Sequence, residues 1–169
     1  MNVLFVCTGN TCRSPMAEGY LRSKNIENLN TSSCGLFADG SSVSQNSVDA
    51  MSEIGIDISS HVSKQITTED IENADRIICM SPSHKQTLES IGVTNIEVLG
   101  GGISDPYGCG LDLYRLCRDQ IIKEIDKLFP DITVSKIEYR HIKEIARLEK
   151  ECFSTPWSEQ TILDSFKAG

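Results

Sequence analysis

The sequence contains no long apolar run and no basic stretch at its N-terminus. A membrane-spanning helix needs about 18 or more apolar residues in succession, so we expect no spanning segment and no membrane partner. The first ten residues, MNVLFVCTGN, hold only five apolar residues before the first cysteine. That pattern is not typical of a secretory signal peptide.

Positive charge is also scarce, with 16 lysines and arginines against 24 aspartates and glutamates and a net charge of −8. An acidic protein is a poor partner for nucleic acid or for an anionic membrane surface, so we expect neither. The excess of negative charge belongs to residues 1–131, because residues 132–169 carry six basic and six acidic side chains. A small phosphate could still enter a loop built to hold anions.

Cysteines are frequent, but no C-x-x-C pair occurs and their number is odd. This indicates a reducing, cytoplasmic environment rather than a secreted disulfide framework. The three histidines are scattered, and no zinc-ligand spacing is visible. We therefore expect no metal and no cofactor. The seven cysteines are Cys7, Cys12, Cys34, Cys79, Cys109, Cys117 and Cys152.

Over residues 1–131, short apolar runs alternate with helix signals. This alternation predicts an α/β fold, a flavodoxin-like four-stranded parallel sheet of order 2-1-3-4 flanked by helices, with its ligand beyond the carboxyl ends of the strands. Ser14 and Pro15 predict an N-cap and first turn, and Thr67-x-x-Asp70 predicts a capping box. The expected strands are 2–7, 30–34, 75–80 and 95–99, and the main helices are 14–24, 44–54, 81–92 and 111–129.

After residue 131 the pattern changes, and we expect a second unit at 132–169 beside a domain at 1–131. Residues 132–140, ITVSKIEYR, predict a strand. Apolar residues at Ile142, Ile145, Leu148 and Cys152 predict a helical stripe, and a further helix follows the next proline. The result is a small β-α-α fragment without a sheet of its own.

The stretch VCTGNTCRSP joins the first strand to the first helix and separates Cys7 from Arg13 by five residues. A loop entering a helix N-terminus turns its backbone N–H groups inward and forms an anion cradle. Gly9 permits the tight turn, and the Arg13 guanidinium matches two phosphate oxygens. The helix dipole, Arg13 and the Ser14 hydroxyl favour a Cys7 thiolate. A thiolate beneath a bound phosphoryl group is a nucleophile placed for in-line attack, although a buried strand cysteine is more often a passive small side chain.

Such an enzyme also needs an acid for the leaving group and a base for water, and Asp105 in SDPYG is the candidate. The predicted topology brings its loop to the same sheet edge as Cys7. Pro106 restricts the position of Asp105, and Tyr107 offers an aromatic wall. An Asp-Pro turn without a catalytic role is the plain alternative.

These motifs resemble the low-molecular-weight protein tyrosine phosphatase family over about residues 1–131. The resemblance implies Cys7 as nucleophile, Arg13 as phosphate ligand and Asp105 as general acid. It also implies phosphorylated proteins as substrates, an oxyanion or inorganic phosphate in the loop, and a phosphocysteine intermediate. The implied phosphate-binding loop and supporting polar residues are Thr8, Gly9, Asn10, Thr11, Cys12, Arg13, Ser14, Ser33 and His61.

Two loop residues refine the resemblance. A cysteine at the position of Cys12 forms a reversible disulfide with the nucleophile in many relatives, and a passive role is the alternative. Thr11 is similar to the threonine of bacterial protein-arginine phosphatases, whereas phosphotyrosine-directed members carry a bulky aliphatic residue. Gly108 after Tyr107 also resembles the arginine branch. We therefore place Thr11 and Tyr107 in the substrate pocket and favour phosphoarginine over phosphotyrosine.

Other functions remain open at this point. A thiol-based arsenate reductase shares this loop but needs further resolving cysteines; Cys79 lies in a suitable region, and no cysteine follows it until Cys109. A phosphate-binding module without catalysis is disfavoured, because nucleophile, arginine and acid are all present. Residues 132–169 resemble the start of a GNAT-type ribosomal-protein alanine acetyltransferase, so a fragment of a bifunctional protein is conceivable. The acetyl-CoA-binding part is absent, and we expect no acetyltransferase activity.

Overall fold

The computed structural model describes residues 1–130 and 138–168. The chain divides into two compact units, Met1–Pro130 and Asp131–Gly169, and each is considered by itself. No helix in the described part is long and apolar enough to cross a membrane.

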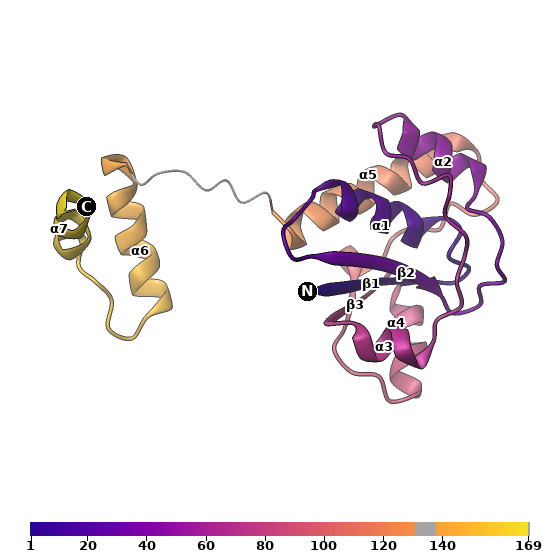
Figure 1. The fold of residues 1–169 in the computed structure, drawn as a ribbon, viewed down its shortest axis with the longest axis horizontal. Helices are drawn as coiled ribbons and strands as arrows, with labels where there is room; N and C mark the ends of the chain where they lie inside the picture. Colours follow the sequence, from indigo (N-terminus) through magenta and orange to yellow (C-terminus); the bar gives the residue numbers. More distant parts are fainter. Residues whose placement is uncertain (131–137, 169) are drawn as a thin grey trace. The chain divides into compact units, whose positions relative to one another are not determined.

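Unit Met1–Pro130 is built on a parallel sheet in the order β2-β1-β3-β4, which confirms the predicted topology (Figure 1). The central strand β1 is buried along all but its first residue, as its apolar sequence requires. The strands are β1 (Asn2–Cys7), β2 (Asn30–Gly35), β3 (Arg76–Cys79) and β4 (Ile96–Val98).

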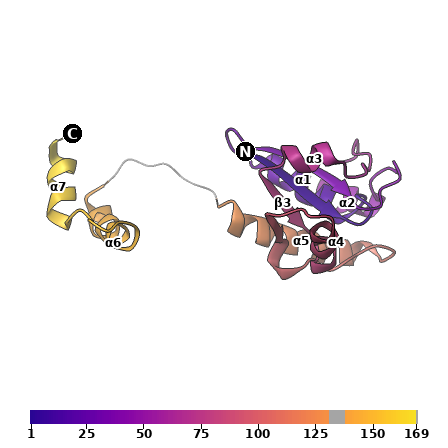
Figure 2. The same ribbon diagram turned by 90° about the horizontal axis from the view of Figure 1, so that it is seen from below.

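Helices cover both faces of this sheet. Alternate residues of β1 point to opposite faces, so Val3 and Phe5 pack with α1, α2 and α5, while Leu4 and Val6 pack with α3 and α4. Figure 1 shows the first group above the sheet, and Figure 2 views the unit from the side of α3 and α4. The helices are α1 (Arg13–Ser23), α2 (Gln45–Ser52), α3 (Thr68–Asn73), α4 (Pro82–Ser90) and α5 (Leu111–Leu128).

Four connections emerge at the carboxyl edge of the sheet, one of which leads from β2 to α2. The loop after β1 leads into α1, the loop after β3 leads into α4, and a 3-10 turn (Leu99–Gly101) followed by residues 102–110 leads from β4 to α5. Because all strands are parallel, their carboxyl ends share one edge. Segments far apart in the sequence therefore meet there.

Of the two caps predicted above, one is confirmed and one is wrong. Thr67 and Asp70 form the capping box of α3, and the Ser81 hydroxyl accepts from the His84 amide at the start of α4. The prediction of Ser14 as an N-cap is wrong, because α1 begins at Arg13 and Cys12 occupies the cap position without a side-chain bond. The Ser14 hydroxyl instead contacts Cys7.

The second unit contains a 3-10 turn (Tyr139–His141), α6 (Ile142–Cys152) and α7 (Glu159–Ala168). Residues 132–137 of the expected strand lie outside the described residues, and the end of that range forms the 3-10 turn. The helix predicted from the apolar stripe is confirmed by α6, although Leu148 and Cys152 are exposed on it. The small core of this unit consists of Ile142, Ala146 and Ile162.

Candidate active site

Cys7 ends β1 and lies beneath a loop that turns sharply at Asn10, which has a positive φ of 54°. The Asn10 amide donates to the Cys7 sulfur at 3.2 Å. The Ser14 oxygen lies 3.0 Å from the same sulfur and accepts from the Asn10 side chain at 2.9 Å. Since the Ser14 oxygen is already an acceptor, its proton is available to the sulfur. Two donors and the N-terminus of α1 thus stabilise negative charge on Cys7.

The Asn10 side chain is fully buried and ties the loop to three other segments. Its oxygen accepts from the Lys64 backbone amide at 2.9 Å and from His61 Nε2 at 3.0 Å. A backbone amide can only donate, so this contact fixes the orientation of the Asn10 carboxamide. The Asn10 nitrogen donates to Ser33 at 2.8 Å as well as to Ser14. The structure therefore brings together Asn10, Ser14, Ser33 and His61, four of the loop and supporting residues expected from the sequence.

The network continues to Glu18, a residue that the sequence reasoning missed. The Ser33 hydroxyl donates to a Glu18 oxygen at 2.6 Å, and His61 Nδ1 lies 3.8 Å from the same oxygen. Arg22 pairs with the other oxygen of Glu18. Glu18 lies four residues after Ser14 on α1, so both face the same side of the helix, and this spacing could have signalled it.

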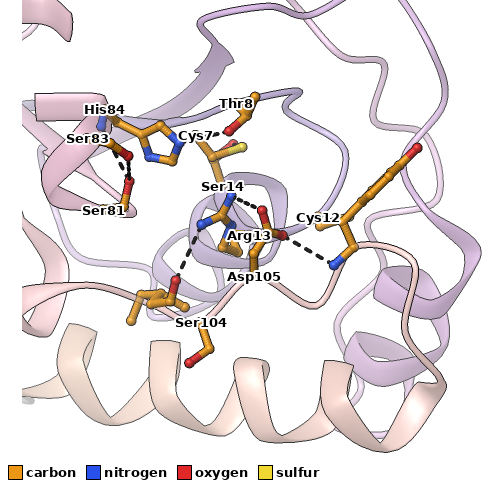
Figure 3. A network of polar contacts seen from close by, with 12 residues as sticks. Cys7, Thr8, Cys12, Arg13, Ser14, Ser81, Ser83, His84, Ser104 and Asp105 are labelled. Atoms are coloured by element: carbon orange, nitrogen blue, oxygen red, sulfur yellow. Dashed lines mark hydrogen bonds and ion pairs between the residues drawn. The ribbon is translucent and has the colours of Figure 1, made fainter.

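Arg13 is buried beneath the pocket with its guanidinium partly unpaired. Nη2 lies 2.5 Å from a carboxylate oxygen of Asp105, and Nη1 donates to the Ile103 carbonyl at 3.4 Å (Figure 3). Nε is buried and has no partner in the described part of the chain. A buried donor without an acceptor is unfavourable, and a bound oxyanion would supply that acceptor.

The loop forms the base of a pocket of 440 Å³ that also includes Asp105 and Tyr107. Its other wall comes from the segment after β2. The side chain of Tyr107 is exposed, and the Tyr107 amide donates to Asp105 at 3.2 Å. A hollow of 660 Å³ near the amino ends of β3 and β4 is larger, but no cysteine or serine lines it. The lining of the first pocket is Cys7, Thr8, Gly9, Thr11, Cys12, Arg13, Phe37, Asp39, Ser41, Ser42, Ser44, Asp105 and Tyr107.

Cys12 lies at the side of this pocket and contacts a tyrosine that the sequence reasoning missed. The Cys12 sulfur is 3.4 Å from the hydroxyl of Tyr114, which also accepts from Ser44 at 3.2 Å. Burial raises the pKa of Tyr114 to about 12, so the phenol remains protonated at neutral pH. Thr11 places its hydroxyl 3.6 Å from the Cys12 sulfur.

The first turn of α4 contributes a third missed residue, His84. Its Nε2 lies 2.9 Å from the hydroxyl of Thr8, the residue next to Cys7 (Figure 3). Burial, and secondarily the charge of Arg13, lower the pKa of His84 to about 4. The imidazole is therefore neutral at neutral pH. The local sequence around His84 gave no indication that this turn meets the loop after β1.

The chain is similar to known proteins over most of its length. The family model for low molecular weight phosphotyrosine protein phosphatases matches residues 2–143. The chain belongs to this family. It is therefore a hydrolase, a protein phosphatase of the cysteine-based type, as predicted.

Individual members of the family carry different names. A protein-arginine-phosphatase from Geobacillus stearothermophilus is 36% identical over 75% of this chain and 92% of its own length. A solved structure of the YwlE arginine phosphatase from Geobacillus stearothermophilus superposes with a TM-score of 0.72, at 35% identity over 75% of this chain and 89% of that one. The low molecular weight protein-tyrosine-phosphatase PtpB of Staphylococcus haemolyticus is 39% identical over 76% and 97%. An arsenate reductase of Staphylococcus aureus is 34% identical over 70% and 88%.

Proposed function

We propose that this phosphatase hydrolyses phosphoarginine in proteins through a phosphocysteine intermediate. The observation that carries the proposal is one pocket that holds Cys7 and Arg13 at its base and Thr11, Asp39 and Asp105 around them. A guanidinium presents several N–H donors, and the threonine hydroxyl and two carboxylates are acceptors for them. A phenyl ring would gain nothing from those acceptors. Relatives named protein-arginine-phosphatase add support.

The proposed reaction has two steps. The Cys7 sulfur attacks phosphorus, a bond forms between sulfur and phosphorus, and the phosphorus–nitrogen bond breaks with its electron pair passing to nitrogen. Asp105 supplies the proton to that nitrogen. Asp105 then takes a proton from water, which attacks phosphorus and releases inorganic phosphate and the Cys7 thiolate.

Substrate binding to Arg13 would free Asp105 from its ion pair with Arg13. In the free enzyme Arg13 Nη2 is paired with Asp105 at 2.5 Å. A phosphoryl group on the cradle offers oxygens to the Arg13 fork, including the unpaired Nε. Arg13 and the loop amides then stabilise the charge on the equatorial oxygens. Asp105, whose side chain is half exposed, is freed to reach the leaving nitrogen.

The substrate is tested by comparing a phosphoarginine protein, a phosphotyrosine peptide and a simple aryl phosphate. We expect the highest kcat/KM for phosphoarginine. Thr11→Ile should shift the ratio of phosphoarginine to phosphotyrosine kcat/KM by about tenfold towards phosphotyrosine, since one pocket group discriminates by about 1–3 kcal/mol. A ratio that Thr11→Ile leaves unchanged would remove Thr11 from the specificity argument.

Arsenate reduction is the second candidate, because one relative carries that name. It would require a resolving thiol that can reach Cys7 and ionise. Cys79 is fully buried in β3, and burial raises its pKa to about 12, which disfavours it. Cys34 and Cys117 have pKa values raised to about 12 for the same reason. Arsenate-dependent consumption of reduced thioredoxin by the purified protein would support this candidate over hydrolysis.

For the C-terminal part we propose a separate unit at 132–169 that resembles the start of a GNAT acetyltransferase and has no acetyltransferase activity. The separation of the unit from Met1–Pro130 is consistent with this division. Incubation with acetyl-CoA and ribosomal-protein N-terminal peptides should give no transfer. Measurable transfer would contradict the proposal.

A further inference from the structure

His84 and Thr8 form a contact that the proposed roles of Cys7, Arg13 and Asp105 leave unused. His84 is 5% exposed and lies on the first turn of α4, whereas Thr8 is exposed and lines the pocket. The Thr8 hydroxyl and His84 Nε2 are 2.9 Å apart. Figure 3 shows the histidine ring beside Cys7 and pointing towards Thr8. The contact therefore joins a buried imidazole to a hydroxyl beside the nucleophile.

The other ring nitrogen decides the direction of this hydrogen bond. His84 Nδ1 is buried and has no partner within the described residues. A neutral imidazole carries one proton, on either nitrogen. If that proton were on Nδ1, a buried N–H group would have no acceptor, which is rarer and costlier than an unpaired lone pair. We therefore assign the proton to Nε2, and His84 donates to the Thr8 oxygen.

This direction determines what Thr8 presents to the pocket. With one lone pair of the Thr8 oxygen occupied by His84, the hydroxyl proton is free to point elsewhere. Thr8, Cys7 and Arg13 line the same pocket, so an oxygen of a phosphoryl group above Cys7 is the available acceptor. The opposite tautomer would take the Thr8 proton and turn a lone pair towards the anion.

We propose that the neutral His84 is a positioning residue that orients the Thr8 hydroxyl as a hydrogen-bond donor to the bound phosphoryl group. The pair adds a side-chain donor to the backbone amides of the cradle. This proposal rests on the proposed binding of phosphate by the site, and it holds whether the substrate residue is arginine or tyrosine. The low pKa of His84 implies that the device works unchanged across neutral pH.

The test measures binding of inorganic phosphate by calorimetry and phosphate inhibition of aryl phosphate hydrolysis. Thr8→Val, which keeps the shape but removes the hydroxyl, should weaken phosphate binding about tenfold, as expected for a hydrogen bond to a charged group. Thr8→Ser should restore it to within about threefold. Thr87→Val is the matched control, since it removes an exposed hydroxyl that donates to the Ser83 carbonyl within α4, the helix that carries His84.

The role of His84 is tested by coupling. His84→Leu should weaken phosphate binding in the parent but add little to Thr8→Val, and His84→Gln, which keeps an N–H donor, should retain most of the binding. The proposal is overturned if Thr8→Val binds phosphate like the parent. It is also overturned if the loss of phosphate affinity in the double variant equals the product of the fold-losses in the single variants Thr8→Val and His84→Leu. It is also overturned if His84 variants lower Tm without changing phosphate affinity, or if the Thr8→Val effect disappears between about pH 5 and pH 8. Phosphate binding without turnover of any substrate would reject the proposed function and still test this pair.

Discussion

The pocket has a buried floor and an exposed rim, and the two differ in how their residues are held. The floor is the polar network beneath the loop that lines the pocket, and it consists of Asn10, Ser14, Ser33 and Glu18, which are at most 8% exposed and bonded to one another in a chain. The rim includes Phe37 and Tyr107, which are 74% and 76% exposed, and the exposed Asp39. Buried, fully paired polar groups hold one geometry, whereas exposed side chains can be exchanged at little cost in stability. The floor can therefore hold the reacting groups in one geometry, whereas substitutions in the rim can change which substrate binds.

The largest effect is expected at Cys7, the proposed nucleophile, which lies above the floor. Cys7→Ser should lower kcat by about 10⁴-fold or more on every phosphorylated substrate, because the intermediate requires the sulfur nucleophile. Steady-state assays on the substrate panel measure this, with Cys152→Ser as the control because Cys152 is exposed in the other unit. Full turnover by Cys7→Ser would show that the assignment of the nucleophile is wrong.

The next largest effect is expected at Asp105, where floor and rim meet. Asp105→Asn keeps the shape but cannot give or take a proton, so kcat should fall by about 10²–10⁴-fold. The loss should be greater for leaving groups that need protonation than for an acidic nitrophenol. Rapid-mixing measurements would separate the first step from hydrolysis of the intermediate. An equal loss for all leaving groups would indicate a binding role through Arg13 instead.

Within the floor, Asn10→Ala removes four hydrogen bonds at once and leaves the Lys64 amide without its acceptor. We expect the free energy of unfolding to fall by about 2–4 kcal/mol, because buried partners lose their pairing and alanine tolerates the positive φ poorly. Urea denaturation measures this. Asn46→Ala serves as the control, since Asn46 makes one side-chain bond to the Cys109 carbonyl.

The smallest effect is expected at the rim. The Ser41 hydroxyl and amide donate to Asp39 and lower its pKa, so this carboxylate stays ionised at neutral pH. Asp39→Asn should reduce kcat/KM for phosphoarginine about threefold to tenfold and leave phosphotyrosine unchanged, with no change in Tm. Because Asp39 is ionised well above its lowered pKa, the reduction should be constant between about pH 5 and pH 8. An equal reduction for both substrates would remove Asp39 from the specificity argument.

Much of the fold was predictable, since β1, β3 and β4 are short apolar runs and the main helices follow them in alternation. The strand β2, NTSSCG, is mostly polar and carries a weaker local signal. The prediction failed where tertiary contacts compete with local ones. Ser14 has the residue type of an N-cap, yet its hydroxyl contacts Cys7, because the sulfur and Asn10 surround it. Leu148 fits a helical stripe but is exposed, because the described part of that unit buries only a few side chains against one another.

The sequence by itself determined which residues form the loop from Cys7 to Arg13, because the proposed nucleophile, the glycine turn, the arginine and the helix start are neighbours in the chain. It also placed Asp105 near them, since parallel strands bring their following loops to one edge. Only the tertiary structure showed that Glu18, His84 and Tyr114 lie close to this loop. These residues reach the loop through burial and hydrogen bonds between separate segments, and such contacts leave no periodic or local signal in a sequence.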